Sequence, residues 1–144
     1  MSGKAVFRDL SDTECRELLA RNNMGRIAYQ IHEHVNILPL GYVYHGEWLA
    51  CRTQEGSKVS VLRHSPYVAF EVDEVEGLFD WKSVVVQGSW YEEDLPTEGR
   101  EETLAALRSV APDVLTPDDP TPFRDVLFRI HIREITGRAA STKS

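Results

Sequence analysis

Apolar and polar residues alternate with a period of two over much of the chain, which is the pattern of half-buried β-strands. The alternating segments predict strands over residues 25–31, 35–40, 41–44, 47–52, 67–73, 83–91 and 126–138. Apolar residues at helical spacing predict helices over residues 12–22, 57–64 and 97–110. Tight turns join most of the strands, and a regular strand–helix–strand order is missing. The pattern therefore predicts a mainly β (α+β) fold, a small antiparallel barrel with two or three helices outside it.

Local signals set several boundaries of these elements. Ser11 followed by Glu14 forms a capping box at the start of the first helix. Pro39 interrupts a strand and has no amide hydrogen to donate, so it predicts a sheet edge, a bulge or a ligand-facing position. Residues 74–80 read as an acidic loop, and residues 112–122, with four prolines, read as an irregular surface loop.

The size and composition of the chain are those of one soluble domain. We expect residues 1–144 to form that domain, with an ordered core over 10–138 and frayed ends. Cys15 and Cys51 are too few for a disulfide framework. A membrane-length apolar run and an N-terminal signal core are both missing from the sequence, so we expect a cytoplasmic protein that does not bind membranes.

The charge balance argues against nucleic acid as a partner. The chain has 16 lysines and arginines and 23 aspartates and glutamates, a net charge of −7. Such a chain repels phosphate backbones at long range, although a local basic patch can still bind one phosphate. His32 and His34 have no third ligand at suitable spacing, so we expect no metal site.

The segment from Arg52 to Arg63 has the features of a phosphate cradle. A strand ends at Arg52 and Thr53, a glycine loop follows, and Ser57 and Lys58 open a short helix. Amides at a helix N-terminus, hydroxyl groups and cations all favour an anion. The spacing is not that of a Walker A loop. The alternative is a hairpin exit with solvated charges, which the spacing alone favours.

Two further segments suit a flat ligand. The break Leu38-Pro39-Leu40-Gly41 inside a strand permits close approach to the backbone, and the alternative is a β-bulge at a barrel corner. Trp81 and Ser83 stand at the entrance of a valine-rich strand, where a planar ligand could contact them. The alternative is a core strand with an interfacial tryptophan.

Taken together, these segments resemble the pyridoxamine 5′-phosphate oxidase-like flavoproteins, which have an FMN-binding split-barrel fold. The resemblance rests on Asn-Ile-Leu-Pro-Leu-Gly-Tyr at 36–42, Gly-Ser-Lys-Val at 56–59 with the strand over 64–73, and Trp-Lys-Ser-Val-Val-Val-Gln-Gly at 81–88. It covers residues 10–91 and the last strand. The chain is most similar to small, actinobacterial-type members that resemble the nitroimidazole-resistance proteins.

The resemblance implies a homodimer that binds FMN in a groove between its subunits. Ser57 and Lys58 would then contact the FMN phosphate, with help from Arg52 or Thr53. The backbone from Leu38 to Gly41 would line the edge of the isoalloxazine ring, and Ser83 would contact the flavin.

The activity implied is that of an FMN-dependent oxidoreductase, which passes a hydride through the flavin between a reduced nicotinamide and an unknown small molecule. No catalytic side chain is identified. Oxidation of vitamin B6 is not implied, because the chain has Gly-Ser-Lys where the true oxidases have Gly-Ser-Arg-Lys, and lacks their C-terminal arginines. The alternatives are a split barrel that binds a deazaflavin coenzyme or haem, and a flavin-binding protein without turnover.

Overall fold

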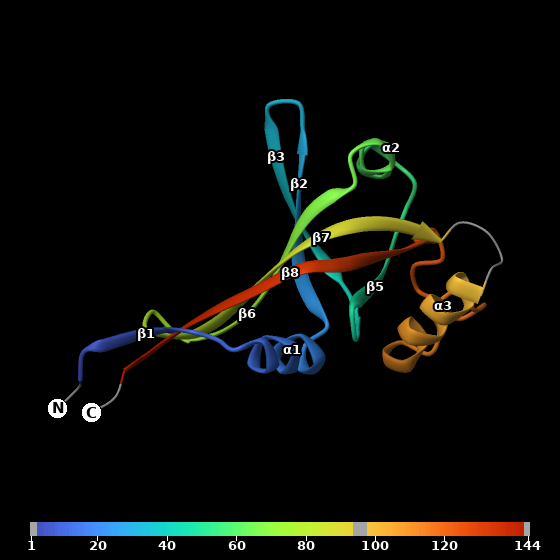
Figure 1. The fold of residues 1–144 in the computed structure, drawn as a ribbon. Coiled ribbons are helices and arrows are strands. Elements are labelled where there is room, and N and C mark those ends of the chain that lie inside the picture. The colour runs from blue at the N-terminus through green and yellow to red at the C-terminus, as the bar shows by residue number, and fades with distance from the viewer. Residues whose placement is uncertain (1–2, 94–97, 143–144) are drawn as a thin grey trace.

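The computed structural model describes residues 3–93 and 98–142. Within these residues the chain forms one antiparallel sheet of eight strands and three helices (Figure 1). The strands are β1 (Ala5–Asp9), β2 (Met24–Ile31), β3 (His34–Gly41), β4 (Val43–His45), β5 (Trp48–Thr53), β6 (Tyr67–Gly77), β7 (Asp80–Glu93) and β8 (Val126–Thr142). The helices are α1 (Asp12–Arg21), α2 (Ser57–His64) and α3 (Glu98–Val110).

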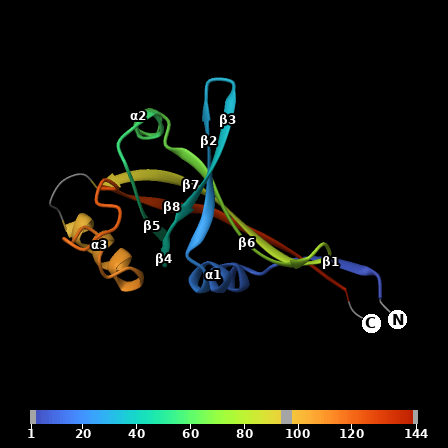
Figure 2. The same cartoon turned by 180° about the vertical axis from the view of Figure 1, so that it is seen from behind.

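The sheet is a split barrel. Hydrogen bonding follows the order β3-β2-β6-β7-β8-β5-β4, and β1 pairs with the C-terminal part of β8. The described parts of β3 and β4, at the two ends of this order, do not pair with each other, so the barrel stays open there. Strands β7 and β8 form a long ribbon that crosses the molecule, with both chain ends at its far end (Figures 1 and 2). The split antiparallel β-barrel with outer helices is confirmed.

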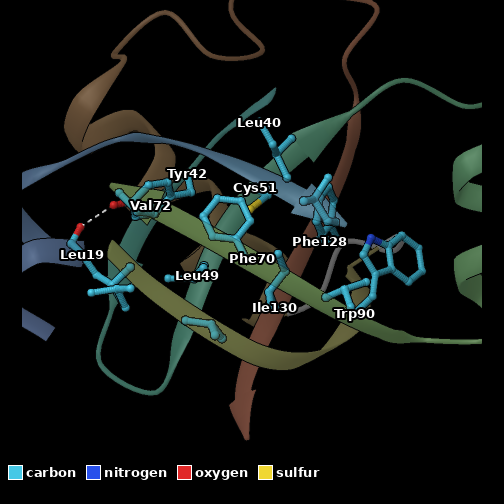
Figure 3. Close-up of a cluster of buried hydrophobic side chains, with 14 of the residues drawn as sticks. Leu19, Leu40, Tyr42, Leu49, Cys51, Phe70, Val72, Trp90, Phe128 and Ile130 are labelled. Carbon is cyan, nitrogen blue, oxygen red and sulfur yellow. Dashed lines mark hydrogen bonds between the residues drawn. The ribbon is translucent and has the colours of Figure 1, made fainter. Parts of the chain in front are cut away.

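The main core lies inside the bent sheet, around Phe70 (Figure 3). The side chain of Phe70 is fully buried and meets the Tyr42 ring edge-on, with ring centroids 5.2 Å apart. Helix α1 contributes Leu18 and Leu19 to this core, and the hydroxyl of Tyr42 donates a 2.7 Å hydrogen bond to the Leu19 carbonyl. This bond satisfies a hydroxyl that would otherwise be buried without a partner.

A second apolar cluster lies between the sheet and α3. Its buried members are Trp48, Ala50, Ala106, Leu107, Val114 and Leu127. Because the inner face of β5 packs in the main core and its outer face packs under α3, this strand is buried on both faces. The predicted helix over 97–110 is confirmed over Glu98–Val110, and residue 97 lies outside the described residues.

Other local predictions are also confirmed. Ser11 and Glu14 form both hydrogen bonds of the capping box at the start of α1. Pro39 lies on β3, which is the end strand of the sheet order and pairs with β2. An edge strand tolerates a residue without an amide donor.

No helix among the described residues is long and apolar enough to span a membrane.

Two predictions about strand ends are wrong. The frayed end expected beyond residue 138 instead continues β8 to Thr142, where the strand pairs with β1. The ordered part is therefore wider than 10–138, because each chain end supplies the hydrogen-bonding partner of the other. The expected loop over 74–80 is shorter, since β6 continues to Gly77 and β7 begins at Asp80. Backbone pairing between β6 and β7 continues to Gly77 and Asp80, although this stretch carries acidic side chains.

Candidate functional site

A pocket of about 600 Å³ lies where the ends of β3 and β5 meet the start of α2 and the C-terminal part of α3. Its apolar wall includes Met24, Val43, Leu107, Val110, Ala111 and Val114. Its polar side includes Arg52, Thr53, Gln54, Lys58 and Arg124. Strand β3 adds Pro39, Leu40 and Gly41. The pocket therefore combines an apolar wall, a stretch of backbone and a group of cations, which suits a flat ligand with an anionic group.

The local structure explains why β3 ends at this pocket. The amide of Tyr42 donates to the Asn23 carbonyl over 3.0 Å, which ties the residue after β3 to the residue before β2. Leu40 pairs with Gly25, and its side chain is buried against the main core. These contacts hold the backbone of Pro39 and Gly41 at the wall of the pocket.

Six of the ten predicted site residues are brought together here, namely Pro39, Leu40, Gly41, Arg52, Thr53 and Lys58. Leu38 and Ser57 neighbour them in sequence, but they do not line the pocket. Both are exposed, Leu38 on β3 and Ser57 at the first position of α2. Gly56 caps α2 and has no side chain to bond the first-turn amides, so an anion there would meet unbonded donors.

Arg52 is already paired inside the protein. Its guanidinium donates to the Asp119 carboxylate over 2.6 and 3.0 Å and to the Thr121 hydroxyl over 2.8 Å. The Asp119 side chain has no exposed surface, and the guanidinium beside it holds the pKa of this carboxyl well below its usual range. Because its charge is already paired with a buried carboxylate, Arg52 has a structural role here and is not free to bind a phosphate. Arg63, on α2, is likewise paired, with Glu55 and Glu92.

Lys58 and Arg124 differ from Arg52. Within residues 3–93 and 98–142, neither side chain forms a hydrogen bond or an ion pair, and both line the pocket. Burial lowers the pKa of Lys58, and the positive charge of Arg124 lowers it further. Asp and Glu are absent from the described pocket lining. The pocket is thus a positive region in a chain of net charge −7.

Cys51 lies behind this wall and is not a nucleophile in its present position. Its side chain is fully buried, and burial raises the pKa of its thiol. A buried thiol of raised pKa is inert and packs as a small apolar group.

Comparison with known proteins identifies the family to which the chain belongs. The sequence model described as pyridoxamine 5′-phosphate oxidase matches residues 11–139. The chain belongs to this family. A protein of Rhizobium meliloti (strain 1021), itself described as uncharacterised, is 30% identical over 92% of this chain and 95% of its own length.

Solved structures agree with the assignment to the pyridoxamine 5′-phosphate oxidase family. A FAD-binding protein from Mesorhizobium loti is 30% identical with a TM-score of 0.80, over 96% of this chain and 99% of that one. A Bacteroides thetaiotaomicron protein, described as a candidate 5-nitroimidazole antibiotic resistance protein, has a TM-score of 0.73 at 13% identity, over 100% of this chain and 95% of that one. The latter likeness concerns the fold alone.

Within this family fold, Trp81 and Ser83 lie apart from the pocket of their own chain. The Ser83 hydroxyl donates a 2.8 Å hydrogen bond to Glu71, and burial raises the pKa of that carboxyl. Trp81 lines a second pocket of about 360 Å³ at the β6–β7 ribbon, and its ring nitrogen donates to the Leu78 carbonyl. One chain therefore does not gather all ten predicted residues around one ligand.

Two features of the pocket bear on haem and a deazaflavin coenzyme as ligands. Histidine and cysteine, two common ligands of haem iron, are absent from the described lining. A longer acidic tail would need further cations, but Arg52 and Arg63 are both paired with carboxylates. The described residues also hold no cluster of three groups suited to a metal ion.

Sequence reasoning missed Asp119 and Arg124. Both belong to the segment between α3 and β8, which its prolines mark as irregular. Nothing in the local pattern distinguishes the buried Asp119 from the exposed Asp118. Only the folded structure identifies these residues, because it shows that Arg52 of β5 bonds Asp119 and not Asp118.

Proposed function

We propose that this protein is an FMN-dependent oxidoreductase of the pyridoxamine 5′-phosphate oxidase family. The observation that carries the proposal is the pocket whose lining joins an apolar wall, the backbone of Pro39 to Gly41, and Lys58, which has no ion pair with any of the described residues. The FAD-binding relative from Mesorhizobium loti supports a flavin as the ligand class. The choice of FMN within that class rests on the resemblance of the segments at 36–42, 56–59 and 81–88 to FMN-binding split barrels.

A bound flavin would supply hydride transfer between a reduced nicotinamide and a small organic acceptor. Lys58 would bind its phosphate by a charge-assisted hydrogen bond. The backbone of Pro39 to Gly41 would orient the edge of the ring, and the apolar residues of α3 would exclude water from it. Tyr42 is not a proton donor here, since its hydroxyl is bonded to Leu19 and burial raises its pKa.

The same proposal includes a homodimer. Strand β3 lies at the end of the sheet order and exposes Val35 and Ile37, at 70% and 64% of their surface. An edge strand with exposed apolar side chains favours a partner over water. Because Trp81 and Ser83 do not line the pocket of their own chain, a flavin in that pocket would meet them only from a second copy.

The function is tested by titrating the protein with FMN and following the change in flavin fluorescence. Lys58→Ala should weaken FMN binding about 10- to 100-fold, the worth of one charge-assisted hydrogen bond. Lys4→Ala removes the same charge from an exposed position outside the pocket and should bind FMN like the parent protein. Equal affinities in the parent and Lys58→Ala would remove Lys58 from the phosphate site.

Turnover is tested on the flavin-loaded protein under anaerobic conditions. Addition of NADH or NADPH should bleach the visible absorption of the oxidised flavin, and a nitro or quinone acceptor should restore it. Bound flavin that neither nicotinamide reduces would instead identify a flavin-binding protein without turnover.

A further inference from the structure

Two cations that are unpaired within the described part of the chain line the pocket, and they come from segments far apart in the sequence. Lys58 comes from the first turn of α2, and Arg124 comes from the segment that leads into β8. Neither has a hydrogen bond or ion pair with any of the described residues, and the described lining contains no carboxylate to neutralise them. Two like charges that line one cavity repel each other, and an anion between them removes this cost.

The position of Arg124 is set by a buried ion pair behind it. Asp119 accepts hydrogen bonds from the amides of Leu115 and Thr121 over 2.7 and 2.9 Å, in addition to those from Arg52. The amide of Arg124 in turn donates to the Thr121 carbonyl over 3.0 Å. Arg52 reaches the Arg124 carbonyl over 3.5 Å. The backbone of Arg124 is therefore fixed to β5 through Arg52 and Asp119.

The sequence suggests that Arg52 helps to bind a phosphate, but in the structure Arg124 is better placed for that role. Arg52 lines the pocket, but its charge is balanced by a carboxylate with no exposed surface. Arg124, in the segment between α3 and β8, has an exposed side chain at the same pocket and no carboxylate bound to it among the described residues. The Arg52–Asp119 ion pair thus stabilises the wall of the pocket, and Arg124 supplies the positive charge that a ligand can reach.

We propose that Arg124 is a second phosphate-binding residue, that Lys58 and Arg124 bind the same phosphate group of the flavin, and that the Arg52–Asp119 pair positions Arg124. The proposal rests on the proposed flavin-binding function. Its charges balance, because a phosphate monoester carries a charge of about −1.5 to −2 at pH 7 and meets two cations. An arginine can also bind two phosphate oxygens at once.

The test compares FMN with riboflavin, which has the same ring and no phosphate. Arg124→Gln should weaken FMN binding about 10-fold or more and change riboflavin binding less than about 2-fold. Arg133→Gln is the matched control, since it removes the same charge from β8 outside the pocket. An unchanged affinity for FMN, or an equal loss for both ligands, would overturn the role of Arg124.

The positioning role is tested with Asp119→Asn, with Asp118→Asn as the control at an exposed neighbour. Asp119→Asn should lose affinity for FMN and keep its affinity for riboflavin, provided that circular dichroism shows a folded protein. A variant that is merely loosened would lose both ligands in parallel, and that result would overturn the positioning role. Should Asp119→Asn not fold, Thr121→Val, which removes one contact of Arg52, gives the same comparison.

A measurement without flavin separates this proposal from the proposed function. Inorganic phosphate is titrated into the ¹⁵N-labelled protein at constant ionic strength, and the Arg124 side-chain Nε–H signal is followed by NMR. A saturable shift that disappears in Lys58→Gln supports a shared anion site even if no flavin binds. A parent protein whose Arg124 signal does not respond to phosphate contradicts the shared site, whatever the flavin titrations show.

Discussion

Gly25 offers the sharpest test of how the sheet packs beside the pocket. A Cβ atom at this position would lie 2.6 Å from two ring atoms of Phe70 and 2.7 Å from the Glu71 carbonyl oxygen. The Phe70 ring is fully buried at the centre of the core, and the carbonyl belongs to the backbone of β6. Rotation of one side chain therefore cannot make room, and β2 must move away from β6.

The cost of Gly25→Ala follows from this geometry. Overpacking a well-packed core costs about 1–3 kcal/mol, and a clash with backbone belongs at the upper end of that range. A cost of about 2–3 kcal/mol and a urea m-value of about 2 kcal/mol/M lower the midpoint of unfolding by about 1–1.5 M. The movement should also reach the pocket, because Gly25 pairs with Leu40 and Leu40 lines the pocket. We therefore expect weaker FMN binding in this variant.

Gly77→Ala is the matched control for the same chemical change. A Cβ at Gly77 has no atom within 4 Å, so this variant should unfold at the parental urea concentration or slightly above it. Both variants are measured by urea unfolding with circular dichroism and tryptophan fluorescence as probes. Equal midpoints for Gly25→Ala and Gly77→Ala would refute the packing argument.

Three further predictions concern other parts of the molecule. Glu74 accepts hydrogen bonds from Arg21 and Asn22, which lower its pKa from 4.5 to about 2. The ionised Glu74 therefore stabilises the fold above pH 4.5, and this stabilisation is lost as the pH falls towards 2. The urea midpoint of Glu74→Gln should fall less steeply with acid than that of the parent protein. Parallel curves for the two proteins would contradict this prediction. Ser11→Ala removes the cap of α1 and should cost about 1 kcal/mol in thermal unfolding, and an unchanged melting temperature would exclude a stabilising cap. Ile37→Lys on the exposed edge strand should shift the proposed dimer to a monomer in analytical ultracentrifugation, and a dimer that persists would place the interface elsewhere.

The fold could be predicted because its elements are coded locally. The capping box at Ser11, the alternation in the strands and the proline on the edge strand each act over a few residues. The pairing of β1 with the end of β8 could not be predicted in this way. Neither strand carries a local sign of its partner, because the two lie at opposite ends of the chain.

The candidate site could be predicted in part for the same reason. Lys58 and the Pro39–Gly41 segment were identified by motifs that lie within short stretches, and the structure brings them to one pocket. Arg52 was identified by its position next to the cradle, but its partner Asp119 lies 67 residues away in sequence. The pairing of these two decides which arginine presents its charge to the pocket, and no local pattern contains that information.

The central claim is that the pocket binds a flavin. The most direct measurement is to incubate the purified protein with FMN, remove unbound ligand by gel filtration and record the visible absorption spectrum of the protein peak. If the pocket binds a flavin, the peak should show the two absorption bands of oxidised flavin, with one flavin per chain, and both bands should be much weaker in Lys58→Ala. A colourless protein peak at saturating FMN would contradict the account.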